Sequence, residues 1–519
     1  MNEFSGAGRS RADELLAAGI KVGVALIVAA VLLVLYSRQV KVEAQVQDLL
    51  AGARVAGGRS GGARAELSRD TPSGWLAAEA AFQRALDLQP SNPYALSAFA
   101  DVEAMLAGAG YDDRGPRADD ALLRAEARNL KVPERFEAHA LRLIQGGRAG
   151  EAEAYLLALL SKYGSVPRLI DALGRAQRAS GKLAEAKASF HRAQEAEWRS
   201  PRNVADYAQM LLEEGAAPEA VGAFDRALQA NSEHLRSLIG KSRAQAKMRG
   251  GDLKLAGSIL DGVLARGVDE LPSRLRATAL SARAEIKLAK GDVAGAAADA
   301  NEAVRSQPAL AAALHARALV AAAAPATRSE ALSDFKAAIA ADPYDASTYF
   351  DGAAALAAAG DDSAAEKLLG AYAATLPLNA RYQLALAQLL VRKGDDAGAA
   401  SALQKAQALE PANAAVWFEQ GRLAQRRHDQ KAAVAAYERA ASLRDDYPEV
   451  YRQMGSLYLE NKDVQDALRV FTEALARYRA EHTPVAQLET FYSDVQQQIA
   501  HAGKSRLAAE WVKEARALR

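Results

Sequence analysis

The most regular feature of the sequence is an apolar pattern that returns in the same form along most of the chain. In each copy an alanine is followed, at helical spacing, by a bulky apolar residue and then by a second small residue. The clearest copies are Ala186-Phe190-Ala193, Ala220-Phe224-Ala227, Ala331-Phe335-Ala338, Ala433-Tyr437-Ala440 and Ala467-Phe471-Ala474. This spacing places the three residues on one face of a helix. A pattern with a fixed period in the thirties is typical of a solenoid, in which each unit is a helical hairpin.

Prolines mark the ends of the predicted second helices, at Pro308, Pro343, Pro377 and Pro411. Proline ends a helix because its ring fixes φ and disfavours helical backbone in the residue before it. Working outward, units begin near Pro93, Pro133, Pro167, Pro201, Leu235, Ala277, Ala312, Ala346, Ala380, Ala414 and Pro448. We therefore predict an all-α chain with a solenoid over residues 72–480. Residues 481–519 read as the polar capping helices that a solenoid requires.

A second apolar pattern lies near the N-terminus. Leu15 to Tyr36 is apolar apart from Lys21, and a lysine near a helix end can extend its ammonium group to the lipid headgroups. A membrane span needs about 20 apolar residues. We predict a short basic tail over 1–14 and a transmembrane signal anchor over 15–37. A cleaved signal peptide and a buried core helix are the alternatives, although Arg38 and Lys41 place charge where cleavage would occur.

The orientation of this anchor and the segment after it are less well defined. Basic residues are balanced on the two sides of the span, and the short basic tail favours repeats in the periplasm, with a cytoplasmic orientation as the alternative. Residues 38–71 are rich in glycine and arginine and predict a flexible linker. Alternatively, the arginines of this segment form a basic strip on anionic lipid.

Composition narrows the function further. The 519-residue chain is half hydrophobic but only 6% aromatic, and its net charge is +1. That balance gives no reason to expect a nucleic-acid partner. A single core rarely grows to this size, so several domains or a linear array are expected. The absence of cysteine excludes disulfides, thiolate zinc sites and thiol catalysis.

Candidate catalytic chemistry is sparse. The seven histidines are scattered, and none forms a pair with metal-ligand spacing on one helix face. The glycine-rich stretches lack a phosphate-binding loop motif. Asp361-Asp362 and Asp395-Asp396 each follow a glycine at a turn between helices, where aspartate is a preferred N-cap. We therefore expect no enzyme activity, no metal and no cofactor.

The repeats resemble a known family. The unit from Ala414 carries Trp417, Gly421, Ala424, Ala433, Tyr437 and Ala440, and the next carries Tyr451, Gly455, Tyr458, Ala467, Phe471 and Ala474. This pattern is similar to the tetratricopeptide repeat (TPR). The resemblance implies a right-handed superhelix of about ten to eleven hairpins. Small residues then let the helices approach closely, and the first helices line a concave groove that binds peptide segments or protein surfaces.

The family's inward-facing positions can be carried over to this chain. They give a groove lined by Arg168, Arg175, Arg178, Arg202, Arg236, Arg243, Lys247, Phe350, Arg381, Phe418, Arg422 and Arg426. Basic ends and an apolar middle suit a peptide with acidic flanks, because the planar guanidinium donates two hydrogen bonds to one carboxylate. These groove residues are expected to be exposed. The alternative is that the arginines only solvate a helix face.

Together these observations predict a membrane-anchored scaffold or adaptor that binds partner proteins in a bacterial envelope assembly, at the inner membrane. Two other functions stay open. One is a periplasmic chaperone-like holdase for client chains. The other is a regulatory or structural subunit of a polysaccharide synthesis or export complex.

Overall fold

The computed structural model describes residues 11–51, 54–55, 58–59, 63–68, 70–111, 113–128, 131–248, 250–267, 270–480, 483 and 485–517. These residues form 27 helices and one antiparallel pair of two-residue strands, β1 (Arg54–Val55) and β2 (Gly58–Arg59). The chain divides into two compact units, Met1–Gly147 and Arg148–Arg519, here called unit 1 and unit 2. The predicted all-α class is confirmed. Most of the predicted basic tail over 1–14 lies outside the described residues.

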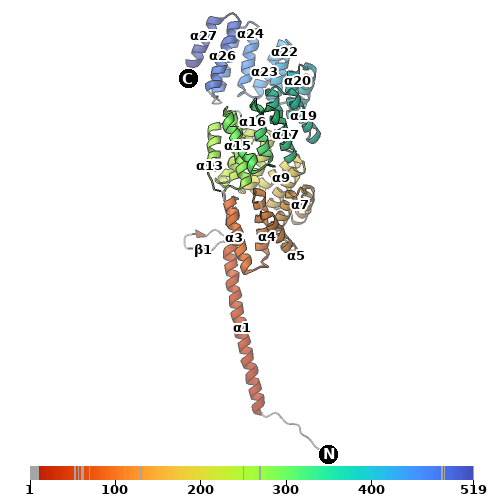
Figure 1. Ribbon diagram of the computed structural model, residues 1–519, viewed down its shortest axis with the longest axis vertical. Helices are drawn as coiled ribbons and strands as arrows, with labels where there is room; N and C mark the ends of the chain where they lie inside the picture. The colour runs from red at the N-terminus through yellow and green to blue at the C-terminus, as the bar shows by residue number, and fades with distance from the viewer. Residues whose placement is uncertain are drawn as a thin grey trace, which may run out of the picture. The chain divides into compact units, whose positions relative to one another are not determined.

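Unit 1 contains one long helix, α1 (Arg11–Ala51), which projects from the unit's other helices (Figure 1). These are α2 (Ala63–Ser68), α3 (Pro72–Leu88), α4 (Pro93–Ala109), α5 (Arg114–Ala127) and α6 (Pro133–Gln145). The linker predicted over 38–71 is wrong for its first part, because α1 continues to Ala51. Val46 and Leu50 are buried in one cluster with Trp75 and Phe82 of α3. This short apolar stripe at helical spacing docks the end of α1 onto α3 and keeps it helical.

A search of the part of the chain described above finds no helix that is long and apolar enough to cross a membrane. The transmembrane helix predicted over 15–37 is therefore not confirmed.

Unit 2 consists of α7 and ten helical hairpins stacked on one another (Figure 1). The helices are α7 (Ala149–Tyr163), α8 (Pro167–Ala179), α9 (Leu183–Ala196), α10 (Pro201–Glu214), α11 (Ala217–Ala230), α12 (Leu235–Lys247), α13 (Leu253–Leu264), α14 (Ser273–Ala289), α15 (Val293–Ser306), α16 (Ala311–Ala323), α17 (Arg328–Ala341), α18 (Ala346–Ala358), α19 (Asp362–Thr375), α20 (Ala380–Lys393), α21 (Asp396–Leu409), α22 (Ala414–Arg426), α23 (Gln430–Leu443), α24 (Pro448–Glu460), α25 (Val464–Ala480), α26 (Val485–His501) and α27 (Ser505–Ala517). The helices α4 to α27 number twenty-four, which is more than ten to eleven hairpins account for. The solenoid prediction itself is confirmed.

Close packing of glycine against an aromatic ring explains the repeat pattern. A Cβ atom added to Gly421 would lie 2.5 Å from the Tyr437 ring, and one added to Gly455 would lie 2.6 Å from the Phe471 ring. Both rings are fully buried. A side chain larger than glycine therefore cannot fit between the two helices of these hairpins without displacing the ring.

The turns between paired helices follow the predicted chemistry. Gly360 and Gly394 have φ values of 88° and 82°, a backbone conformation that glycine adopts without strain. The aspartate after each glycine caps the next helix: Asp361 accepts a hydrogen bond from the Ala364 amide, and Asp395 accepts one from the Gly398 amide. These aspartates are N-caps, as predicted.

Hairpins of unit 2 that are far apart in sequence contact one another, and we call this the return contact. The Tyr344 ring, in the turn before α18, lies against Gly181, in the turn after α8, so closely that a Cβ on Gly181 would be 2.5 Å from it. Leu183 and Tyr344 pack against the same apolar cluster, and α10 contacts α18. The hairpins α8–α9 and α18–α19 are therefore neighbours in space although four hairpins separate them in sequence.

Candidate functional site

The first helices of the hairpins in unit 2 share one surface, which we call the inner face. Arg178 on α8 shows this arrangement, because its Nη2 atom lies 2.9 Å from Glu213 on α10 and 2.8 Å from Asp342, before α18. On α12, Lys247 Nζ lies 2.6 Å from Asp351 of α18. Side chains from first helices far apart in sequence thus meet, so the first helices face one another.

Most of the charged side chains on this face form one cluster, which we call the inner ion-pair cluster. It consists of Arg175, Arg178, Asp206, Glu213, Arg236, Arg243, Lys247, Glu285, His315, Asp342, Asp345 and Asp351. Asp206 receives two guanidinium groups: Arg175 Nη2 lies 2.6 Å from its Oδ2, and Arg236 contacts its Oδ1. Arg243 Nη2 lies 3.6 Å from Glu285 Oε1. Cations and carboxylates therefore neutralise one another inside the protein.

The pKa values of the carboxylates in the cluster are set by two opposing effects, burial and the charges of neighbouring side chains. Burial alone would raise the pKa of Asp206, but Arg175 and Arg236 outweigh it and hold that pKa below its usual value. Burial also works against Asp351, whose pKa is lowered by Lys247, His315 and Arg381. For Glu213 burial prevails over Arg178, and its pKa is raised. The carboxylates of Asp206 and Asp351 are thus ionised only because cations face them.

His315 is buried in the cluster, beside the carboxylate of Asp351. Its side chain is 2% exposed, and neither ring nitrogen has a hydrogen-bond partner among the residues that the structure describes. The nearest carboxylate oxygen, Asp351 Oδ2, lies 3.8 Å from Nε2. Burial lowers the pKa of His315, against the opposing effects of Glu285 and Asp351.

These contacts correct the expectation that the groove cations are exposed. Five of the predicted residues, Arg175, Arg178, Arg236, Arg243 and Lys247, are engaged in ion pairs within unit 2. Arg168 and Arg202 are half-buried. Arg175, Arg236 and Arg243 are covered because an adjacent first helix in the stack places a carboxylate opposite them. The return contact between distant hairpins adds Asp342 for Arg178 and supplies Asp351 for Lys247. The binding role assigned to these residues stays a prediction.

The inner face also contains an open pocket of 440 Å³, which we call the alanine pocket. It lies between α18, α19 and α20 and is lined by Phe350, Asp351, Ala353, Ala354, Ala357, Ala358, Ala365, Leu369, Arg381, Leu384, Ala385, Gln388, Leu389 and Arg392. Phe350 and Arg381 were among the predicted groove residues. Alanine methyl groups leave this space open because they are too short to reach across it.

One side of the alanine pocket is a rigid aromatic layer. Phe350 is only 5% exposed, and its ring centroid lies 4.7 Å from that of Tyr372. The Arg381 guanidinium lies over the Phe350 ring at 4.5 Å from the centroid, within the range of a cation–π contact. Phe350 thus lines the pocket without projecting into solvent.

The rim of the pocket carries more hydrogen-bond donors than acceptors. Arg381 lies 3.5 Å from the Asp351 carboxylate and 3.5 Å from the Glu213 carbonyl oxygen, which are long contacts. Arg392 is half exposed and donates to Asp362 at 2.7 Å. Gln388 donates to Glu419. Arg381 in particular retains capacity to bind an acidic group.

The last three predicted residues lie elsewhere in unit 2. Phe418 is 8% exposed and packs against Tyr437 and Tyr447, with ring centroids 5.9 Å and 5.1 Å away. It is a core residue, and its expected exposure was wrong. Arg422 pairs with Glu419 at 3.1 Å and Arg426 with Asp396 at 2.9 Å. Both arginines are about half exposed.

Several residues of the site were not predicted from sequence. Leu369 lines the alanine pocket from a second helix, α19, and Leu384 and Leu389 line it from α20. The family positions used for the prediction lie only on first helices, so they could not include Leu369. Among the described residues no cluster of three or more histidine, aspartate or glutamate side chains is arranged to hold a metal ion.

No protein-family model and no curated protein matches the sequence. Solved structures of helical-repeat proteins are similar in fold. The Cut9–Hcn1 hetero-tetramer of the APC/C matches with 15% identity and a TM-score of 0.39, covering 85% of this chain and 93% of that one. The human IFIT1 dimer with m7Gppp-AAAA matches with 17% identity and a TM-score of 0.42, covering 84% and 99%. Yeast Tom70 matches with 12% identity and a TM-score of 0.41, covering 74% and 95%.

Proposed function

We propose that this protein is a membrane-anchored scaffold whose inner face binds one protein partner at the alanine pocket. The observation that carries the proposal is the difference in accessibility along the inner face. In the ion-pair cluster the protein's own side chains satisfy the charges, whereas the alanine pocket is open and apolar. Apolar pockets with a few polar groups at the rim are the usual form of a binding site.

The chemistry of the pocket defines the partner segment. Its alanine and leucine walls accommodate one bulky apolar side chain. Arg381 and Arg392 at the rim are placed to donate to a carboxylate next to that side chain. The proposed ligand is therefore an extended segment of a partner protein, with a large apolar residue beside an aspartate or glutamate.

Peptide display on the purified full-length protein tests this specificity. Enriched peptides should carry the apolar–acidic pair, and their affinity should fall at least roughly tenfold for the Ala354→Phe variant, which fills the pocket. Ala354 is exposed on α18, so the larger side chain does not enter the core. The matched control is Ala374→Phe, at an exposed position of α19 outside the pocket. Equal affinity for both variants would reject the pocket as the site. Weak binding of many unrelated unfolded chains would instead favour a holdase.

The anchor part of the proposal rests on α1. Large apolar side chains between residues 22 and 36 are at least half exposed: Val22, Val24, Leu26, Ile27, Val28, Val31, Leu32, Leu33, Val34, Leu35 and Tyr36. Consecutive residues from 31 to 36 occupy all sides of a helix. A partner helix would cover only one stripe, whereas lipid covers every side. We therefore propose that this segment of α1 lies in the hydrocarbon of a bilayer.

Membrane fractionation tests the anchor directly. The protein should stay in the membrane fraction after washing with high salt or alkaline carbonate. The variant with Leu32→Asp and Leu33→Asp should be released. Release of the unaltered protein by salt alone would contradict the proposal that α1 is inserted into the bilayer. Protease added to spheroplasts then tests the proposed periplasmic placement in a bacterial envelope, because the repeats should be digested while the membrane is sealed.

A further inference from the structure

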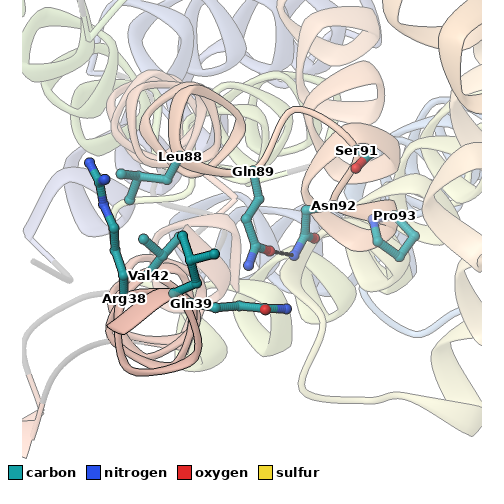
Figure 2. A pocket seen from close by; sticks show the side chains of 9 residues that line it. Arg38, Gln39, Val42, Leu88, Gln89, Ser91, Asn92 and Pro93 are labelled. Carbon is teal, nitrogen blue, oxygen red and sulfur yellow. Dashed lines mark hydrogen bonds between the residues drawn. The ribbon is translucent and has the colours of Figure 1, made fainter. Parts of the chain in front are cut away.

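A second pocket, of 530 Å³, lies in unit 1 where the exposed apolar segment of α1 ends. We call it the α1 pocket. Leu35, Arg38, Gln39 and Val42 line it from α1, and Leu88, Gln89, Ser91, Asn92 and Pro93 line it from the end of α3 and the start of α4 (Figure 2). Its wall is apolar at Leu35, Val42, Leu88 and Pro93, and the other lining residues are polar.

The polar part of this pocket is suited to an anion. None of the described lining residues is acidic, and no ion-pair or hydrogen-bond partner of Arg38 is found among the residues described by the structure. Asn92 caps α4 and Pro93 is its first residue, so the positive end of the helix dipole lies at the pocket. Glu43 is the carboxylate nearby, and it accepts hydrogen bonds from Gln47 and Gln89. Among the described residues that line the pocket, Arg38 is therefore the one with a charged side chain.

The position of the pocket identifies the source of the anion. In Figure 2 Arg38 extends alongside Leu88, while Gln89 and Asn92 are joined by a hydrogen bond. Toward the N-terminus, α1 exposes the apolar side chains of residues 26–36 without interruption of charge. Ten residues of helix cover about 15 Å, which is half of a hydrocarbon core of about 30 Å. A molecule with an anionic head at Arg38 and acyl chains along α1 fits this arrangement.

From this geometry we infer that the α1 pocket binds the phosphate headgroup of an anionic phospholipid. Arg38 pairs with the phosphate, and the Gln39 amide and the Ser91 hydroxyl supply hydrogen-bond donors. The acyl chains lie against Leu35 and the exposed apolar segment of α1. This inference rests on the proposed membrane anchor and adds to it a specific headgroup site.

The test compares lipids in mixed micelles of the full-length protein. Bound lipid is counted by native mass spectrometry during titration with phosphatidylglycerol or with phosphatidylcholine of the same acyl chains. Phosphatidylglycerol should bind roughly fivefold more tightly, since one arginine near a lipid surface contributes about that factor. Arg38→Gln should abolish the preference while both lipids still bind. Arg84→Gln, which removes an exposed arginine of α3 outside the pocket, should leave it unchanged.

Each outcome separates the headgroup site from the anchor. Failure of both lipids to bind the unaltered protein would overturn the anchor and, with it, this site. Binding of both lipids with a preference that survives Arg38→Gln would overturn the headgroup site and leave the anchor intact. Glycerol phosphate without acyl chains should compete poorly, and strong competition would show that the pocket takes a free phosphate and not a lipid.

Discussion

The inner ion-pair cluster and the alanine pocket lie on the same face of unit 2 and have opposite characters. In the cluster, cations on α8 and α12 reach carboxylates of hairpins far along the chain. In the pocket, alanines on α18 and α20 leave space that no side chain fills. The comparison shows that arginines on an inner face are not necessarily accessible to a ligand, because ion pairs within the protein can engage them. Here most of them hold the hairpins together, and the accessible chemistry lies where small residues occur.

Removing a cation from the cluster gives the largest expected effect. Arg178→Met leaves Glu213 and Asp342 without their guanidinium, and the loss should be about 3–5 kcal/mol because a buried charge is left unpaired. Chemical denaturation of full-length protein measures it. Arg192→Met, at an exposed position of α9, serves as the control and should change little. A loss below about 1 kcal/mol for Arg178→Met would mean that the cluster does not hold the hairpins together.

Overpacking beside the alanine pocket gives a smaller effect. A Cβ added to Gly352 would lie 2.8 Å from Leu368 and 3.0 Å from Phe335, so Gly352→Leu should cost about 1–3 kcal/mol. The damage should concentrate in the hairpins that contact α18–α19: its neighbours in the stack and, through the return contact, α8–α9 and α10–α11. Hydrogen exchange resolved by residue detects this. Faster exchange spread evenly over unit 2 would show that the pocket hairpins are not a local unit.

Acidification should weaken the inner ion-pair cluster. Because the pKa of His315 in the folded state lies below the usual 6.5, its contribution is complete above about pH 6.5 and is lost as the pH falls further. Glu213, whose pKa is raised, works in the opposite direction. The effect of His315 is therefore isolated by comparing a variant with the unaltered protein. Between about pH 6.5 and 5 the melting temperature of His315→Gln should fall less steeply than that of the unaltered protein. His501→Gln, at an exposed position, should not, and equal slopes for all three proteins would contradict the assignment.

Filling the alanine pocket should have the smallest effect on stability. Ala354 is exposed on α18, so Ala354→Phe should change the free energy of unfolding by no more than about 0.5 kcal/mol. Thermal unfolding monitored by circular dichroism is sufficient. A clear loss of stability would show that the pocket is part of the core and is not a surface available to a ligand.

The contacts and helix caps that lie within one hairpin could be predicted from the sequence. The glycine at Gly421 and the ring of Tyr437 contact each other as the spacing predicts, and the aspartates after Gly360 and Gly394 cap helices as expected. These features depend on residues within one hairpin, whose helix lengths and connecting turn recur in each unit.

Contacts between distant hairpins could not be predicted in this way. The pair formed by Arg178 and Asp342 depends on how far each hairpin rotates relative to the last, which is not encoded in any one repeat. Phe418 was misassigned for a related reason, because Tyr447 of the next turn covers it. The helical end of α1 was missed because only a few apolar residues, among them Val46 and Leu50, dock it onto α3.

The central claim is that a partner contacts the alanine pocket and not the rest of the surface. Photocrosslinking in the cells that make the full-length protein tests it most directly, with a photoreactive amino acid placed at Ala354, at Ala358 or at Ala374. The account predicts that the same partner is crosslinked from Ala354 and Ala358, which line the pocket, and is absent from Ala374. Crosslinking of that partner from Ala374 alone, or equally from all three positions, would contradict it.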